Sequence, residues 1–269
     1  MAVNHYENFP VASLLLPRHF RHPVAQIYRF AREADDFADE GDAPDTLRMQ
    51  QLESFRAELR RIERGAAPEI PWFADLAVVI RDYHLPLNAF NDLLSAFAQD
   101  VTQKRYANFR EVLDYCQRSA NPVGRLLLVL YGAATPQNLA DSDAICSSLQ
   151  LINFLQDIEV DFGKGRIYMP QDELARFQIS EAQFANRVVG GNWPAFMAFQ
   201  TDRARALLMS GAPLGRRLEG RIGLELRMIV QGGNRILEKL GHAGGDVFRQ
   251  RPVLKWFDWP LLLARALKP

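Results

Sequence analysis

The stretch at residues 147–170 reads SSLQLINFLQDIEVDFGKGRIYMP. Four polar side chains in it recur at intervals of three, four and four residues: Gln150, Asn153, Asp157 and Asp161. A helix of about 3.6 residues per turn carries all four on one face. The other positions are mostly apolar, which indicates a helix buried in a bundle, where unpaired carboxylates cost several kcal/mol. No Lys or Arg lies within this helix, so the pattern favours a bound divalent cation over the alternative, a polar stripe facing solvent.

A second acidic cluster lies at residues 28–40, YRFAREADDFADE. Its carboxylates form two i,i+4 pairs, Asp35 with Asp39 and Asp36 with Glu40. Like charges at this spacing destabilise an isolated helix, which suggests that a ligand offsets them. Tyr28 and Arg32 precede them on the same face, and Arg suits phosphate oxygens, whereas carboxylates reach phosphate only through a metal. The two clusters together predict a cage for a diphosphate bridged by Mg²⁺.

The composition bounds the class of protein. The chain has 269 residues, 48% of them hydrophobic, which is enough for a sizeable core. Its 32 basic and 32 acidic residues give a net charge of zero, so no long-range attraction to nucleic acid or an anionic membrane is expected. Cys116 and Cys146 form no metal motif and fit buried thiols in a reducing cytoplasm. The longest apolar run, 126–131, is far below the ~20 residues of a membrane span. We expect a soluble cytoplasmic protein, peripheral to a membrane at most.

Helical periodicity extends along the chain, and no segment shows strict strand alternation, so we predict an all-α fold with residues 1–269 in a single domain. Helices are expected to begin near Pro23, Pro44 and Asp141, and the second should end at Gly65. The sequence Asn121-Pro122-Val123-Gly124 indicates either a kink beside a ligand or a plain turn between helices. Asp92 and Asp100 are expected at the surface or as caps. Lys164, Arg166 and Tyr168 follow Asp161 closely and should lie near the site.

The two acidic motifs resemble those of the squalene and phytoene synthase family. The resemblance runs from about His5 to Leu240 and implies an isoprenoid-synthase helical bundle around a central cavity. It implies Mg²⁺ as cofactor, with the ligands Asp35, Asp39, Asn153, Asp157 and Asp161. The catalytic carboxylates would be Asp35, Asp36, Asp39, Asp157 and Asp161. The residues that bind substrate would be His5, Asn8, Tyr28, Arg32, Tyr115, Gly124, Gln150, Asn153, Arg166 and Tyr168. His5, taken alone without a metal-ligand partner at helical spacing, is more often a structural residue.

Departures from the family pattern indicate which branch of the family the chain most resembles. Where many members have His-Ser-Lys-Ser-Phe, this chain has His5-Tyr6-Glu7-Asn8-Phe9, and Gln156 replaces an Arg before Asp157. With fewer diphosphate contacts, the chain most resembles the bacterial hydroxysqualene synthases of hopanoid biosynthesis. These take presqualene diphosphate, ionise it and capture the carbocation with water, without reductant. Gly232-Gly233, where relatives often have Tyr, either admits that water or allows close helix packing.

Three alternatives remain. The same fold could condense two prenyl diphosphates to presqualene diphosphate, squalene or phytoene. A di-iron oxidase would need Glu-x-x-His motifs, and no His here has Glu three residues before it. A non-catalytic scaffold would turn both acidic faces to solvent. Neither the oligomeric state nor a protein partner is predicted from the sequence.

Overall fold

The structure is a computed structural model that describes residues 16–249 and 251–268, so His5 and Asn8 lie outside the described residues. Its elements are α1 (Arg18–Asp39), α2 (Asp45–Glu63), α3 (Phe73–Asp82), α4 (Leu87–Thr102), α5 (Phe109–Ser119), α6 (Asn121–Leu130), α7 (Pro136–Gln156), α8 (Ile158–Gly163), α9 (Gln171–Arg176), α10 (Glu181–Ala185), α11 (Trp193–Gly211), α12 (Leu214–Arg217), α13 (Gly220–His242), the 3₁₀ helix η1 (Trp256–Asp258) and α14 (Trp259–Ala266). Within those ranges there is no strand, only an isolated bridge between Arg105 and Ile167. The all-α prediction is confirmed.

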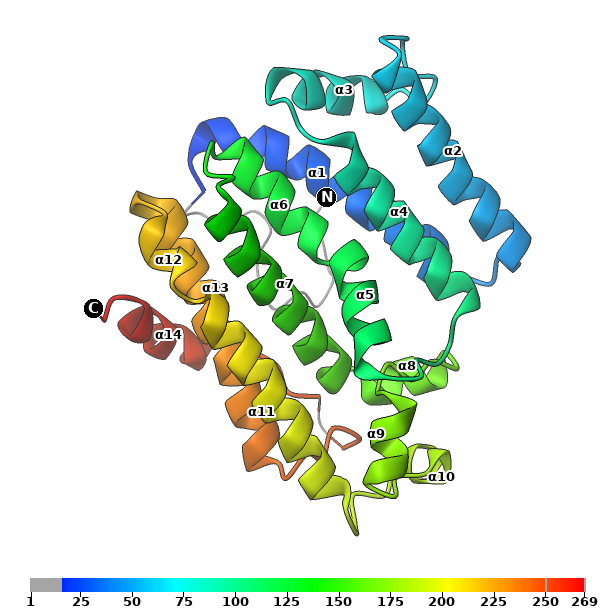
Figure 1. The fold of residues 1–269 in the computed structure, drawn as a ribbon, viewed down its shortest axis with the longest axis vertical. Helices are drawn as coiled ribbons and strands as arrows, with labels where there is room; N and C mark the ends of the chain where they lie inside the picture. The colour runs from blue at the N-terminus through cyan, green and yellow to red at the C-terminus, as the bar shows by residue number, and fades with distance from the viewer. Residues whose placement is uncertain (1–15, 250, 269) are drawn as a thin grey trace.

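Two apolar cores hold the bundle together. One joins α7 to α11 and α13 and contains the fully buried Trp193 and Phe196, and the other joins α1 to α2, α3 and α4 around Phe30 and Phe90. Figure 1 shows α7 in the middle of the bundle, with α6 and α5 on one side and α11 and α13 on the other. The two acidic motifs lie on α1 and at the end of α7. The fold therefore brings helices from both cores together at the site.

Two of the predicted helix starts are wrong. α1 begins at Arg18 and carries Pro23 in its second turn. α7 begins at Pro136, whose missing N–H suits a first turn, and the Thr135 hydroxyl accepts from the Asn138 N–H at 3.3 Å. Asp141 lies one turn inside α7, buried and paired with Arg217. Both helices thus begin upstream of the predicted residue, and at α7 the Thr135 cap marks the start.

The remaining boundaries agree more closely with the sequence. α2 ends at Glu63, and Gly65 follows with φ +70°, a left-handed conformation that favours glycine. The chain breaks at Ala120 between α5 and α6, as the Asn-Pro pair indicates. Among the described residues, no helix is long and apolar enough to cross a membrane.

Candidate active site

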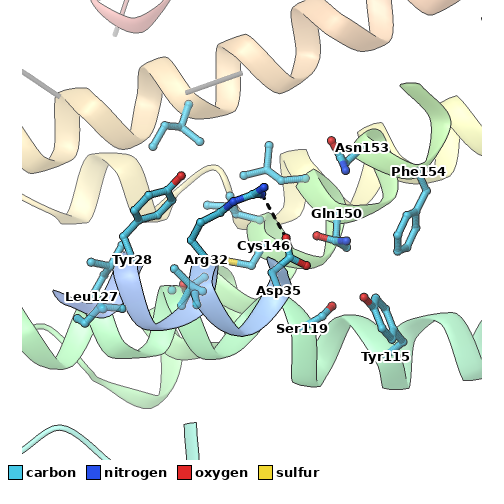
Figure 2. Close-up of a pocket in the computed structure, with 18 of the residues that line it drawn as sticks. Tyr28, Arg32, Asp35, Tyr115, Ser119, Leu127, Cys146, Gln150, Asn153 and Phe154 are labelled. Carbon is cyan, nitrogen blue, oxygen red and sulfur yellow. Dashed lines mark hydrogen bonds and ion pairs between the residues drawn. The ribbon is translucent and has the colours of Figure 1, made fainter. Parts of the chain in front are cut away.

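A cavity of about 870 Å³ lies between the helices and is lined by both acidic motifs. Asp35 and Asp39 from α1 share it with Asp157 and Asp161 from the end of α7 and from α8. Figure 2 shows Arg32 and Asp35 on α1, with Gln150 and Asn153 on α7 beside them. The prediction that the two acidic clusters face one cavity is confirmed.

The cavity is polar at one end and apolar at the other. Ile145 and Asp157 both line it, and twelve residues of helix separate them, or about 18 Å along α7. Beside α6, the middle of α7 and the start of α13, the walls are apolar side chains: Leu127, Leu128, Ile145, Leu149, Leu218, Ile222, Leu226 and Ile229. Such a shape suits a ligand with a charged head and a long hydrocarbon tail.

On α1, four of the five candidate residues line the cavity, Asp39 among them, and one does not. Tyr28, Arg32 and Asp35 line it, and Arg32 Nη1 lies 3.3 Å from Asp35 Oδ2. Asp36 is not among the lining residues, because its carboxylate is held by Arg32 Nη2 at 2.7 Å. Asp36 therefore contacts the cavity only through Arg32 in this structure, and its catalytic role stays a prediction.

The four polar side chains of the second motif all line the cavity, although they do not belong to one continuous helix. α7 ends at Gln156, and Asp157 is both its C-cap and the start of α8. The Asp161 N–H donates to the Asp157 carbonyl at 2.8 Å, which preserves the helical spacing across the break. Gln150, Asn153, Asp157 and Asp161 thus present their side chains to the same space.

Cations from other parts of the chain pair with these carboxylates, and the expectation that Lys164 and Arg166 lie near the site is confirmed. Lys164 and Arg166, from the loop after α8, both pair with Asp39 on α1. Arg251, 94 residues beyond Asp157, binds that carboxylate through Nε and through Nη2, the latter at 3.1 Å. Only tertiary structure brings these cations to the carboxylates, and no local sequence signal identifies Arg251.

Asp100 is a site residue that the sequence analysis placed at the surface or at a cap. It is 3% exposed, lines the cavity, and accepts hydrogen bonds from the Tyr115 hydroxyl at 2.5 Å and the Tyr168 hydroxyl at 2.8 Å. Arg166 Nη1 donates to Tyr168 Oη at 3.2 Å, and Phe154 stacks on the Tyr168 ring at 3.9 Å. Asp39, Arg166, Tyr168, Asp100 and Tyr115 are therefore linked in one network.

Burial raises the pKa of three carboxyl groups that face the cavity. Burial raises the pKa of Asp35 to about 6 and that of Asp100 to about 7. The pKa of Asp161 rises to about 8, through burial and then the charge of Asp157. A positive ligand would lower these values by stabilising the charged forms. Without a positive ligand, these buried carboxyl groups are therefore costly to ionise.

We predict that the metal-free protein loses stability as the pH rises from about 4 to 8. The native pKa values of Asp35, Asp100 and Asp161 exceed their ordinary value of 3.8, so over this interval the native state binds more protons than the unfolded state and the free energy of unfolding falls. Melting temperatures at pH 5 and pH 8 test this, with Asp161→Asn expected to show the smaller fall. A melting temperature that rises with pH would contradict it.

The cavity's Asp and Asn side chains can hold a metal ion only if a second ligand, such as a diphosphate, also binds it. Within the described ranges, no three His, Cys, Asp or Glu side chains converge on one point. Among the same residues, Arg32 Nε, Arg166 Nε and Arg251 Nη1 are buried without a hydrogen-bond partner. Buried N–H donors need acceptors, and Mg²⁺ typically takes one or two carboxylates together with phosphate oxygens and waters. The residues present would therefore fit a diphosphate through these N–H groups, with Asp and Asn side chains to hold Mg²⁺.

The glycines and Gln156 have packing roles. A Cβ on Gly124 would lie 2.3 Å from Ser142 Oγ, so this glycine lets α6 approach α7 at the cavity wall. A Cβ on Gly233 would lie 3.0 Å from Leu149 Cδ2, and neither Gly232 nor Gly233 lines the cavity, which supports the packing alternative over water access. Gln156 is buried and donates to the Pro252 carbonyl, away from the cavity.

Comparison with known proteins agrees with this geometry. The family model for squalene/phytoene synthase matches residues 2–258. The chain is 35% identical to the hydroxysqualene synthase of Rhodopseudomonas palustris over 240 residues, 87% of this chain and 79% of that protein. It is 30% identical to the 15-cis-phytoene synthase of Synechococcus elongatus over 278 residues, 97% of this chain and 89% of that protein.

A solved structure supports the same assignment. The squalene synthase HpnC of Alicyclobacillus acidocaldarius superposes with a TM-score of 0.82 at 35% identity, over 89% of this chain and 90% of that one. A dehydrosqualene synthase with a TM-score of 0.84 is only 20% identical over 94% of this chain and 87% of that one, and so shows the fold alone. Sequence and structure together place this chain in the squalene/phytoene synthase family.

Proposed function

We propose that this protein converts presqualene diphosphate and water to hydroxysqualene and diphosphate, with Mg²⁺ as cofactor. The observation that carries the proposal is the single cavity, which joins one charged end to a long apolar chamber. Similarity to the hydroxysqualene synthase of R. palustris supports this branch of the family. One C–O bond to diphosphate breaks, one C–O bond to water forms, and no electron donor is required.

The charged end holds the leaving group. The unpartnered N–H groups of Arg32, Arg166 and Arg251 are donors for diphosphate oxygens, and Asp35, Asp157 and their neighbours are ligands for the metal. When bound, Mg²⁺ neutralises negative charge that develops on the departing diphosphate. The apolar walls exclude bulk water, so the carbocation survives long enough to rearrange.

A polar network in the cavity wall receives the proton from the captured water. Asp100 accepts hydrogen bonds from Tyr115 and Tyr168, and burial raises its pKa to about 7. A carboxylate has further lone pairs beyond those two bonds. After water adds to the carbocation, Asp100 takes the excess proton, which leaves the neutral alcohol.

Asp100→Asn is therefore expected to lower turnover about a hundredfold, which is typical for loss of a general base, and to abolish the acid limb of the kcat profile. Steady-state rates from pH 5.5 to 9 measure this. Asp92→Asn on the same helix serves as control, since Asp92 does not line the cavity. If Asp100→Asn keeps the wild-type pH profile, the departing diphosphate takes the proton instead.

Metal and diphosphate should stabilise the protein together far more than either does alone. The carboxylates Asp39 and Asp157 are paired with cations that must shift before a metal can bind, and the shifted cations gain partners only when a diphosphate is present. A pair of ligands at ~100 times its dissociation constant adds about 2.7 kcal/mol. Melting curves with Mg²⁺, pyrophosphate or both test this, and full stabilisation by Mg²⁺ alone would contradict it.

The alternative within the family is condensation of two prenyl diphosphates, which similarity to the S. elongatus phytoene synthase favours. The two proposals differ in the substrate that is consumed. Incubation with presqualene diphosphate and, separately, with farnesyl diphosphate, each with Mg²⁺, discriminates them by mass analysis. We expect presqualene diphosphate to be consumed and farnesyl diphosphate to persist, and rapid farnesyl diphosphate consumption would move the chain to the condensing branch.

A further inference from the structure

An apolar surface at the C-terminal end of the described chain lies outside the cavity. We call it the C-terminal apolar surface, formed by the exposed side chains of Trp256, Phe257, Trp259, Leu261, Leu263 and Leu267. Trp256 is 83% exposed and Leu267 is 62% exposed. Figure 1 shows α14 at the edge of the bundle, with its outer side uncovered by other helices.

The concentration of these side chains is unusual within this molecule. Elsewhere among the described residues, the large exposed apolar side chains are dispersed along the chain: Leu47, Met49, Val78, Val160, Val188 and Met209. Isolated exposed apolar residues are normal on a protein surface, whereas a contiguous group marks an interaction site.

The segment is firmly attached on its inner side. Leu262 and Ala266 of α14 are buried on its inner side. Arg227 Nε on α13 donates to the Ala266 carbonyl at 2.8 Å. Lys239 Nζ donates to the Val253 carbonyl at 2.7 Å. α14 therefore already has its packing face, and the aromatic and leucine side chains on the other side are additional to what folding requires.

The unpaired charges of the segment are basic. Residues 255–268 contain Lys255, Arg265 and Lys268, and their single acid is Asp258. Arg265 is paired with Glu238 of α13 at 2.6 Å, which leaves the two lysines. Asp258 is 1% exposed and is paired with Arg235 and Lys239. Exposed lysines thus stand at both ends of the surface, with no exposed carboxylate between them.

The surface also lies behind one wall of the cavity. α14 packs on α13, and Ile222, Leu226 and Ile229 on the other side of α13 line the apolar part of the cavity. Arg227, next to Leu226, makes the hydrogen bond to α14. A single helix therefore separates the C-terminal apolar surface from the chamber suited to a hydrocarbon tail.

We propose that the C-terminal apolar surface docks on the surface of a lipid bilayer that contains anionic lipids. Trp and Phe favour the boundary between headgroups and hydrocarbon, and lysines beside them attract anionic headgroups. α14 has eight residues, about 12 Å, so it lies in the interface without spanning the bilayer. The net charge of the chain is zero, so the attraction is local. The proposed membrane binding is inferred from these side chains alone. Its purpose, delivery of an apolar product to lipid, rests on the proposed function.

A second copy of the chain is the rival occupant. In a two-fold symmetric contact, each copy would present the same patch. Lys255 and Lys268 of both copies would then meet with no exposed carboxylate from this segment to offset them, and like charges brought together disfavour association. Anionic headgroups supply the missing negative charge.

Co-sedimentation of the full chain with vesicles tests the proposal. We expect binding to vesicles of phosphatidylcholine with 30% phosphatidylglycerol, and at least tenfold weaker binding to phosphatidylcholine alone. Trp256→Ser with Leu263→Ser should reduce the bound fraction at least tenfold, and Lys255→Glu with Lys268→Glu should do so only with the anionic vesicles. Leu47→Ser with Met209→Ser, which removes exposed apolar side chains elsewhere, should bind as the wild type does.

Melting temperature and turnover of a detergent-dispersed substrate check that each variant is folded. Absence of vesicle binding by the wild type, or equal binding by the Trp256→Ser, Leu263→Ser variant, would overturn the proposal. Size-exclusion chromatography tests whether a second copy of the chain binds this surface. A wild-type dimer that this variant converts to a monomer would assign the surface to a second copy and overturn the proposal. None of these measurements of binding needs a substrate, so their outcome is independent of the reaction proposed above.

Discussion

Replacing Asp157 by Asn is expected to lower turnover on the order of a thousandfold while leaving the fold intact. Asp157 lines the charged end of the cavity, where it pairs with Arg251 and faces Asp161. Loss of its charge removes a proposed metal ligand and the ionic partner of Arg251. The two side chains are 25% and 18% exposed, and the cost of losing their ion pair is offset in part because the repulsion on Asp161 is relieved. Steady-state kinetics and circular dichroism melting measure the two effects.

Glu159→Gln is the matched control for this variant. Glu159 lies two residues away on α8, pairs with the exposed Arg187 and does not line the cavity, so this change should leave turnover within about twofold. Full activity in Asp157→Asn, or its failure to fold at neutral pH, would contradict the role given to the carboxylate.

Replacing Arg251 by Gln should lower turnover about a hundredfold and weaken the joint binding of Mg²⁺ and pyrophosphate to a similar degree. Arg251 lines the cavity, bonds Asp157 through two nitrogens and keeps Nη1 without a partner. A bidentate, charged donor at a diphosphate site contributes several kcal/mol. Binding is measured by calorimetry with pyrophosphate at saturating Mg²⁺.

Arg249→Gln provides the comparison, since Arg249 is 80% exposed, pairs with Asp246 and lies outside the cavity. Its affinity and turnover should match the wild type. If the Arg251 and Arg249 variants lose activity equally, the effect belongs to the C-terminal segment as a whole and the specific role of Arg251 is wrong.

Local spacing explains the parts of the site that the sequence predicts. Gln150, Asn153, Asp157 and Asp161 lie within three turns of one another, so helical geometry alone fixes their common face, and the break at Asp157 does not disturb it. The Tyr28 to Asp39 motif follows the same rule, apart from Asp36, whose direction depends on Arg32.

The parts that the sequence does not predict depend on contacts across the fold. Asp100 looks like any acid on an amphipathic helix, and it becomes a buried acceptor only because α5 and the loop after α8 bring Tyr115 and Tyr168 to it. Arg251 reaches Asp157 from 94 residues away. Electroneutrality does give one usable signal, since buried carboxylates require cations from elsewhere in the chain.

The central claim is that presqualene diphosphate ionises at the charged end and that its carbocation is captured by water. The most direct measurement is product mass after incubation with presqualene diphosphate and Mg²⁺ in ¹⁸O-labelled water, without NADPH. The account predicts a hydroxysqualene that carries one labelled oxygen, with stoichiometric release of unlabelled diphosphate. An unlabelled product, or a hydrocarbon formed only when NADPH is added, would contradict it.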